Sequence, residues 1–237
     1  MTLFLAMDTA TDVGSVAVGI PGAAAAEVII GKRRHAADLV PAIEETLGLA
    51  GASWKDLEGL VVADGPGSFT GLRIAFATAL GILRERQNIS LYTAPSLVGT
   101  ALLGSQLGPG PVAALYDALR GEVYAAVCDF AAGGGVIMPP ALTTVEWLTA
   151  NGVVAHLAIG DGASAYERQV REWTGRAPVA PPAGAPRASM LIELISSGVA
   201  TRVADPASWE PTYGRAAEAQ VRWERAHGRA LPGAAGG

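Results

Sequence analysis

The chain has 237 residues, of which 50% are hydrophobic and 16% are charged, and its formal net charge is -5. This composition excludes an intrinsically disordered chain and predicts a folded protein of one large or two small domains. The acidic balance argues against direct binding to free duplex nucleic acid, because affinity for the phosphate backbone comes from positive side chains. We therefore expect any nucleic acid to be reached only through a partner.

The cysteine count and the hydropathy of the chain predict its compartment. One cysteine, Cys128, excludes a disulfide within a monomer and is typical of a reducing compartment. The opening MTLFLAMDTA has no basic stretch, and no apolar run is long enough to span a membrane. We expect a cytoplasmic protein that makes no membrane contact.

The first half of the chain begins with three apolar strands joined by tight turns and then alternates helix and strand. The strands are expected at 3–8, 15–20, 25–31, 59–64 and 91–94, and the helices at 38–51, 72–83 and 96–107. Hairpins followed by this alternation predict a mixed sheet with helices on its faces.

A Gly- and Pro-rich stretch at 104–111 predicts a boundary between a domain at 1–107 and a smaller one at 108–237. The second half repeats the first loosely. Its strands are expected at 112–119, 123–130, near 141–145 and at 156–162, and its helices through Trp147 and at 164–173, 188–198 and 216–227. A proline-rich loop covers 177–187, and the tail 230–237 is expected to be disordered. The order predicts an α/β fold of two ribonuclease-H-like lobes, with mixed sheets flanked by helices, as in the actin, Hsp70 and sugar-kinase (ASKHA) superfamily.

The loop GPGSFTG ends a strand and begins a helix, and three interpretations can be compared. A P-loop is rejected because leucine follows where lysine would contact phosphates. A dinucleotide fingerprint is disfavoured because the third glycine is one residue late and the strand is not the first. The third interpretation is a sharp turn in which Ser68 or Thr70 caps the helix, whose free amides could still accept an anion. The residues of this signature loop are Gly65, Pro66, Gly67, Ser68, Thr70 and Gly71.

The helix after this loop has almost no polar face. Between Leu72 and Leu83 the clearly polar residues are Arg73 and Thr78. A helix on the surface of its own sheet buries about half of its circumference, so this one needs a second cover. That cover is either a neighbouring part of the same chain or another subunit, which the small residues Ala75, Ala79 and Gly81 would let approach closely.

Five stretches of the chain resemble the TsaB family (also called YeaZ): LAMDTATDVGSVAV, RRHAADLVPAI, GPGSFTGLRIA, DALRGEVYAAV and EPTYGRAAEAQ. The resemblance implies an actin-like fold without catalysis of its own. It implies partnership with the paralogue TsaD, which places threonylcarbamoyl on the adenosine beside the anticodon of tRNA, and with the ATPase TsaE. A homodimer is implied when TsaD is absent, and tRNA is met only through the complex. In this family the helix after the signature forms the shared interface, which implies the contact residues Phe69, Leu72, Arg73, Ala75, Phe76, Ala79 and Leu80.

The residues that could carry chemistry are few. TsaD-like proteins hold a metal with a His-x-x-x-His pair, whereas the three histidines here are scattered, so no metal site is expected. Asp8, Thr9 and Asp161 lie where superfamily members wrap hairpins around nucleotide phosphates, although Asp and Thr are also ordinary turn residues. No cofactor of the chain's own is expected, and ATP or ADP with Mg²⁺ could lie at the interface of the complex. The alternative function is a free-standing ATP-dependent phosphotransferase that uses Asp8 and Asp161.

Four other residues have simpler expected roles. His35 is expected at the surface where a helix begins, and Cys128 as a buried, inert thiol. Tyr213, with Arg215, is expected to tie the C-terminal segment to the first lobe.

Overall fold

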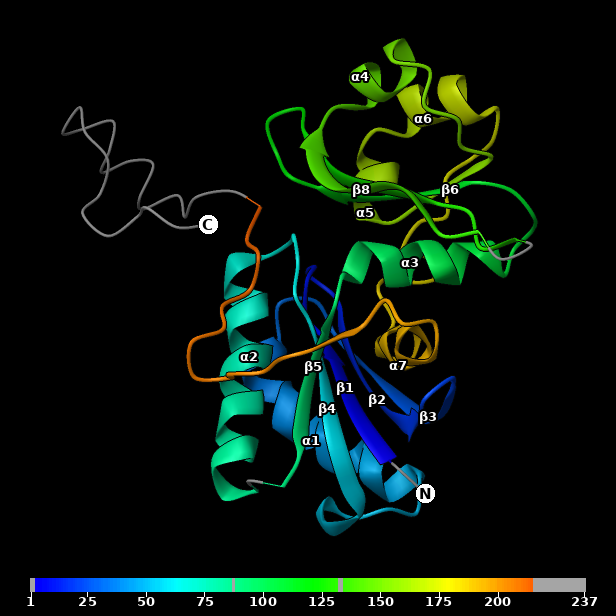
Figure 1. Cartoon of the computed structure of the whole chain (residues 1–237). Helices are drawn as coiled ribbons and strands as arrows, with labels where there is room; N and C mark the ends of the chain where they lie inside the picture. The colour runs from blue at the N-terminus through cyan, green and yellow to red at the C-terminus, as the bar shows by residue number, and fades with distance from the viewer. Residues whose placement is uncertain (1–2, 87, 132–133, 215–237) are drawn as a thin grey trace, which may run out of the picture.

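The chain folds into two mixed sheets, one above the other, with two helices lying between them (Figure 1). The computed structural model describes residues 3–86, 88–131 and 134–214. None of the helices in these ranges is long and apolar enough to cross a membrane.

The first sheet has six strands in the order β10-β5-β4-β1-β2-β3. Their bounds are Leu3–Asp8 for β1, Gly14–Ile20 for β2, Ala23–Ile30 for β3, Leu57–Ala63 for β4, Ser90–Ala94 for β5 and Thr201–Arg202 for β10. The hairpin strands pair antiparallel, and β4 pairs parallel with β1 and β5, so the predicted mixed sheet is confirmed. The helices α1 (His35–Leu49) and α2 (Phe69–Glu85) cover one face, and a short 3₁₀ helix, Trp54–Asp56, precedes β4.

The second sheet, in the order β8-β7-β6-β9, repeats the first in miniature, as predicted. Its strands are β6 (Val112–Asp117), β7 (Val123–Cys128), β8 (Val136–Thr143) and β9 (Leu157–Ile159). Two antiparallel hairpin pairs are again followed by a parallel strand. One face is covered by α4 (Val145–Ala150), α5 (Asp161–Ala165) and α6 (Glu167–Thr174).

Each of the two helices between the sheets packs on the sheet formed by the other half of the chain. The helix α3 (Ser96–Ser105) packs on β6 and β7, whereas α7 (Ala188–Ser196) packs on β1, β2 and β3. Seven of the ten residues of α3 are buried, because α3 is covered by the second sheet and by α7. The division expected after residue 107 would place α3 in the first lobe and α7 with β10 in the second. In the structure α3 packs with the second sheet, whereas α7 packs on the first sheet and β10 pairs with β5.

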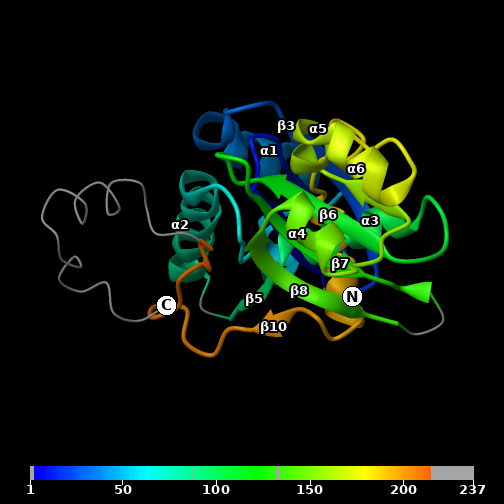
Figure 2. The ribbon, with the colours of Figure 1, turned by 90° about the horizontal axis from the view of Figure 1, so that it is seen from above.

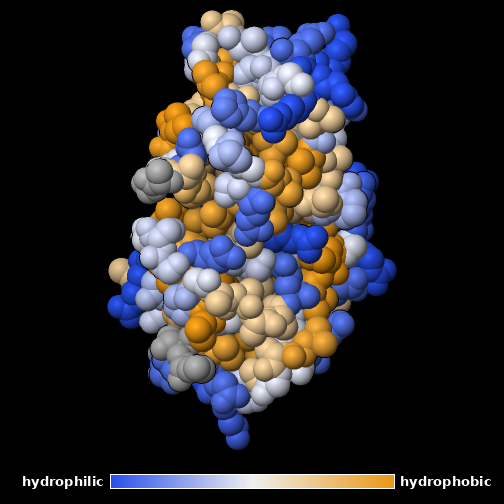
Figure 3. Space-filling model, turned by 90° about the vertical axis from the view of Figure 1, so that its right-hand side faces the viewer, coloured by the Kyte–Doolittle hydropathy of each residue, from blue (hydrophilic) through white to orange (hydrophobic). Residues whose placement is uncertain are grey.

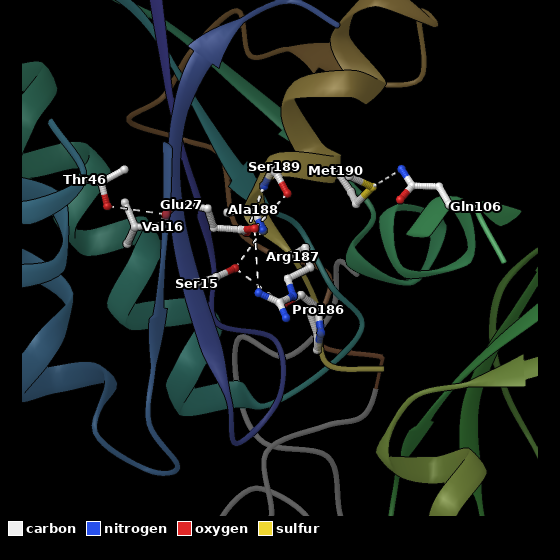
Figure 4. A network of polar contacts seen from close by, with 10 residues as sticks. All are labelled: Ser15, Val16, Glu27, Thr46, Gln106, Pro186, Arg187, Ala188, Ser189 and Met190. Atoms are coloured by element: carbon white, nitrogen blue, oxygen red, sulfur yellow. Dashed lines mark hydrogen bonds and ion pairs between the residues drawn. The ribbon is translucent and has the colours of Figure 1, made fainter. Parts of the chain in front are cut away.

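A polar network attaches α7 to the first sheet (Figure 4). The backbone N–H of Ala188 donates to Ser15 Oγ at 2.7 Å. The N–H and the hydroxyl of Ser189 donate to the carboxylate of Glu27 at 3.1 and 3.0 Å, and Arg187 Nη1 lies 3.9 Å from the same group. The first amides of a helix lack partners within the helix, so β2 and β3 supply the cap that α7 does not provide for itself.

Several element boundaries differ from the prediction. The strand β8 begins at Val136 and tolerates two prolines, because it lies at the edge of its sheet. The helix expected at 164–173 is divided between α5 and α6, which meet at Tyr166. In the proline-rich loop, Val179 forms an isolated bridge with β9. The helix expected at 216–227 and the tail 230–237 lie outside the described residues.

Candidate functional site

The signature loop joins β4 to α2 and is packed too tightly for side chains at its glycines. Gly65 has a positive φ of 98°, and a Cβ there would overlap the carbonyl oxygen of Thr212. A Cβ on Gly71 would overlap the carbonyl oxygen of Thr9. Ser68 Oγ accepts the N–H of Gly71 at 3.2 Å, so the cap predicted at Ser68 or Thr70 is made by Ser68. The glycines therefore serve close backbone packing, which favours the third interpretation of the loop.

The helix α2 presents different side chains in different directions. Leu72, Ala75 and Ala79 are fully buried in the chain's own hydrophobic core. Ala77 and Gly81 face outward and are exposed. The helix is apolar on nearly every side, as the sequence indicates. The structure divides its surface into a face buried in the core, half-buried flanks and an exposed outward face.

A segment from Val203 to Tyr213, here called the strap, runs along the outside of β5 and α2 (Figures 1 and 2, orange). Its first residue donates a backbone N–H to Leu91 O at 2.9 Å. Near its end, Thr212 donates a backbone N–H to Asp64 O at 2.8 Å, directly beside the signature loop. The strap therefore connects the edge of the first sheet with the start of α2.

Aromatic side chains attach the strap to α2. The rings of Trp209 and Phe76 meet edge to face with centroids 4.8 Å apart, and those of Tyr213 and Phe69 lie 4.5 Å apart. The guanidinium carbon of Arg73 lies 4.7 Å from the Phe69 centroid and 6.0 Å from that of Tyr213. Such contacts add to the burial of apolar area. The predicted tie of Tyr213 to the first lobe is confirmed, and Arg215 lies outside the described residues.

The implied contact residues on α2 are thus divided by the structure. Leu72, Ala75 and Ala79 lie too deep to meet a second chain, because their own sheet covers them, which corrects their assignment to a subunit interface. The other four are Phe69, Arg73 and Phe76, which touch the strap, and the half-buried Leu80 one turn beyond Phe76. For these four, contact with a partner stays a prediction.

A cavity of about 420 Å³ lies between the two lobes, beside the signature loop. Its wall includes Asp12, Arg33, Asp117, Asp161 and the end of the strap at Tyr213. Arg33 Nε lies 3.1 Å from Asp12 Oδ2. Acidic and basic groups therefore both face this space.

Backbone strain is concentrated at the rim of this cavity. In the described part of the chain, the non-glycine residues with positive φ are Arg33, Leu119 and Arg120. Arg33 and Leu119 line the cavity, one from each lobe. Such conformations cost about 1–3 kcal/mol each and persist only where surrounding packing holds them.

The three residues considered for nucleotide contact are placed differently. Asp8 and Thr9 are fully buried and are not among the residues that line the cavity. Asp8 accepts the hydroxyl of Ser96 at 2.7 Å and the N–H of Ala10 at 3.0 Å, and Thr9 Oγ1 donates to Gly71 O at 2.8 Å. Burial raises the pKa of Asp8 to about 6, although these hydrogen bonds oppose the rise.

Asp161 is the member of the trio that lines the cavity. Its carboxylate accepts the N–H groups of Gly162 at 2.8 Å and Asp117 at 3.2 Å, and burial raises its pKa. Within the described ranges, His, Cys, Asp and Glu side chains form no group of three that could hold a metal ion. The geometry of Asp161 is that of a turn-stabilising carboxylate.

His35 and Cys128, for which simple roles were expected, are both buried. His35 is 6% exposed and its Nε2 donates to Thr11 O at 2.7 Å, so its expected surface position is wrong. Its ring packs against Gly14, which the short turn between the first two strands brings over the start of α1. Cys128 is buried as predicted, and burial raises the pKa of its thiol to about 12, which keeps it protonated.

Two features of the site were missed by sequence reasoning. Asp64 directly follows β4 and lines a second cavity, of about 330 Å³, whose wall includes Pro66, Pro95 and Pro140. Burial raises the pKa of Asp64 to about 7, and the nearby charge of Asp8 adds to the rise. The acid directly before the glycines was the available signal. The strap was the second omission, and its sequence offers only Trp209 and Tyr213 among turn-forming residues as a hint.

Comparison with known proteins relates the chain to one family. The family model described as "TsaD: tRNA N6-adenosine threonylcarbamoyltransferase" matches residues 29–169. The tRNA threonylcarbamoyladenosine biosynthesis protein TsaB of Escherichia coli is 36% identical over 51% of this chain and 52% of its own length. TsaB of Bacillus subtilis is 28% identical over 81% of this chain and 84% of its own length.

A solved structure from Pseudomonas aeruginosa, described as an uncharacterized protein with similarity to peptidase YeaZ, superposes with a TM-score of 0.70. It is 25% identical and covers 91% of this chain and 100% of its own length. The activator of the 2-hydroxyisocaproyl-CoA dehydratase from Clostridium difficile also superposes, with a TM-score of 0.50 over 83% of this chain and 96% of its own length. At 10% identity this likeness concerns the fold alone, and it agrees with the predicted α/β fold of two lobes. In sequence, the alignment spans about half the length of the Escherichia coli relative.

Proposed function

The chain belongs to the family described by the TsaD model and, within it, to the TsaB (YeaZ) proteins, and from this premise we propose that it takes part in tRNA threonylcarbamoyladenosine biosynthesis. We propose that it acts there as a non-catalytic partner that binds and activates a TsaD-type subunit. In the absence of that subunit it pairs with itself, and tRNA is reached only through the complex. TsaE is proposed as a further member of the assembly, in the cytoplasm.

The observation that carries this proposal is the outward face of α1 and α2. These two helices pack side by side on the first sheet, and Val40 and Pro41 of α1 and Ala77 and Gly81 of α2 are exposed. Small and apolar residues on neighbouring helices permit close approach of helices from another chain. The family signature runs into the first turn of α2, so the family-specific sequence and this face belong to one structural unit.

Apolar surface alone does not single out this face. The side of the molecule away from α2 also carries apolar patches (Figure 3), and Ile29 and Ile137 are 40% and 58% exposed. The position of the α1–α2 face beside the signature loop is what distinguishes it.

The proposed role needs no cofactor held by this chain alone, and ATP or ADP with Mg²⁺ is proposed at the interface of the complex. We do not propose the free-standing phosphotransferase. Its expected metal-holding carboxylate, Asp8, is buried and hydrogen bonded, and Asp161 is engaged by two backbone amides.

Binding and transfer assays test the proposal. The chain is titrated into the TsaD-type protein of the same source in a calorimeter, and threonylcarbamoyl transfer to tRNA is measured with and without it. Ala77→Arg places a long charged side chain on the outward face of α2, so it should weaken binding at least tenfold, about 1.4 kcal/mol. Ala150→Arg on the exposed end of α4 is the matched control. Failure of the folded wild-type chain to bind, or equal affinity of the two variants, would overturn the proposal.

A further inference from the structure

The flank of α2 that bears Phe69, Arg73 and Phe76 is covered by a segment with no regular secondary structure. Between β10 and Gly214 the strap consists of turns and irregular backbone. It crosses the outside of α2 (Figures 1 and 2), the side that faces away from the sheet and that would be exposed to solvent without the strap. The segment that covers this flank therefore comes from a part of the chain more than 100 residues after α2.

The strap is attached by its ends and by a few side chains. Val203 and Thr212 donate backbone N–H groups to Leu91 and Asp64. Between these points, the hydrogen bonds shown by the described residues are internal, since Asp205 accepts the Ala207 N–H and the Ser208 hydroxyl. Segments with few buried contacts and exposed backbone open at lower free energy than the core that they cover.

Two aromatic side chains of the strap form contacts that another chain could reproduce. Trp209 is half-buried on Phe76, and Tyr213 lies on Phe69 below the guanidinium of Arg73. Aromatic pairs and cation–π contacts need only rings in suitable orientation, whichever chain provides them. The outward face of α2 with Ala77 adjoins this flank, so one partner could cover both.

We propose that the strap is an exchangeable cover, and that a partner presenting aromatic or flat apolar side chains displaces it from the Phe69–Phe76 flank of α2. This inference rests on the proposed function, because it takes the TsaD-type subunit as that partner. In the isolated chain the strap competes with the partner, so the measured affinity is reduced by the fraction of molecules in which the strap is closed.

Hydrogen exchange on the chain alone tests whether the strap opens by itself. The Thr212 and Val203 amides should exchange at least 100-fold faster than the amides of β4, and their rates should respond little to low urea concentrations. Local opening exposes little surface, whereas global unfolding exposes much. If the Thr212 amide exchanged at the same rate as the β4 amides, by global unfolding alone, the strap would not open by itself and the inference would be overturned. This result does not depend on any partner.

Calorimetry with the TsaD-type protein tests the competition. A double variant, Trp209→Ala with Tyr213→Ala, should bind at least fivefold more tightly than the wild-type chain. Trp147→Ala, which removes a 51% exposed tryptophan from α4, should bind as the wild type does. If the double variant does not unfold cooperatively, Trp209→Ala alone takes its place. If the double variant bound with weaker or unchanged affinity, the inference would be overturned, because the strap would then be part of the interface or unrelated to it.

The two proposals fail differently. If neither the wild type nor the variant binds the TsaD-type protein, the proposed function fails and the exchangeable cover, which names that protein as the displacing partner, fails with it. If both bind and loosening the strap brings no gain in affinity, the exchangeable cover alone fails.

Discussion

Gly71 packs against the backbone of the loop between β1 and β2, which leaves no room for a side chain. A Cβ there would overlap Thr9 O, and Thr9 Oγ1 donates to Gly71 O at 2.8 Å. Gly71→Ala must therefore move either the start of α2 or the turn after β1. We expect a loss of about 1–3 kcal/mol in the free energy of unfolding, measured by urea denaturation.

Gly81 provides the matched control on the same helix. A Cβ at Gly81 meets no atom within 4 Å, and the residue lies in the interior of α2. Gly81→Ala should leave stability unchanged or raise it by up to about 1 kcal/mol, because alanine favours the helix. Equal losses in the two variants would contradict the packing role given to Gly71.

Asp64 links stability to pH. Burial raises its pKa from 3.8 to about 7, so between these values the folded chain binds a proton that the unfolded chain has released. The free energy of unfolding therefore falls as pH rises through this window. Asp64→Asn removes the part of this dependence that Asp64 contributes and should stabilise the chain at pH 8 by about 3 kcal/mol relative to its effect at pH 4. The raised pKa of Asp8 keeps its own contribution in both chains. Urea denaturation at both pH values measures the difference.

Asp56 is the control for this linkage. Its pKa is lowered by hydrogen bonds to Ser53, so its contribution is present at higher pH and is lost only as pH falls below the ordinary value. Asp56→Asn should leave the slope between pH 5 and 8 unchanged. An unchanged slope in Asp64→Asn would show that Asp64 is solvated in the folded chain.

At the scale of elements, the attachment of α7 depends on a serine from β2. Ser15 is fully buried and accepts the first amide of the helix, that of Ala188. Ser15→Ala leaves this buried N–H without its partner and should cost about 1–3 kcal/mol. Ser196→Ala, at the exposed end of the same helix, should change stability by less than about 0.5 kcal/mol. Thermal or urea unfolding measures both variants. Equal losses in the free energy of unfolding would contradict the capping role of Ser15.

The elements that sequence could predict are those with a clear local period. The strands of the first hairpin are short, mostly apolar runs bounded by turns, and α1 has apolar residues at spacings of three to four, so their positions were correct to within a few residues. The capping serine of α2 was equally local. These features depend on neighbours in sequence, so the residues alone specify them.

The elements that sequence could not place are those whose partners lie far along the chain. Periodicity predicted the helix α7 but not its position on the first sheet, which depends on Glu27 and Ser15 more than 160 residues away. The strap has no period at all, and its place is set by rings on α2. For the same reason the sequence does not reveal that a distant segment of the same chain covers part of the apolar flank of α2.

At the scale of the whole molecule, the exchange of α3 and α7 joins the lobes into one core. Residues from both sheets and both helices share a single hydrophobic cluster, including Phe4 and Val61 of the first sheet and Tyr116 of the second. Neither sheet retains its inner cover if the other half of the chain is removed. The two lobes should therefore unfold together rather than as separate domains.

Leu191 tests this cooperativity, because it lies at the contact of α7 with α3. It is fully buried, and its Cδ2 would lie 3.3 Å from a Cβ on Gly99. Leu191→Ala leaves a cavity between the lobes and should cost about 2–5 kcal/mol. Hydrogen exchange of the slowest amides in β4 and β7 should accelerate by the same factor, since both depend on one global opening. Acceleration confined to β4 would mean that the second sheet keeps its stability without α7, and the lobes would then be independent folding units.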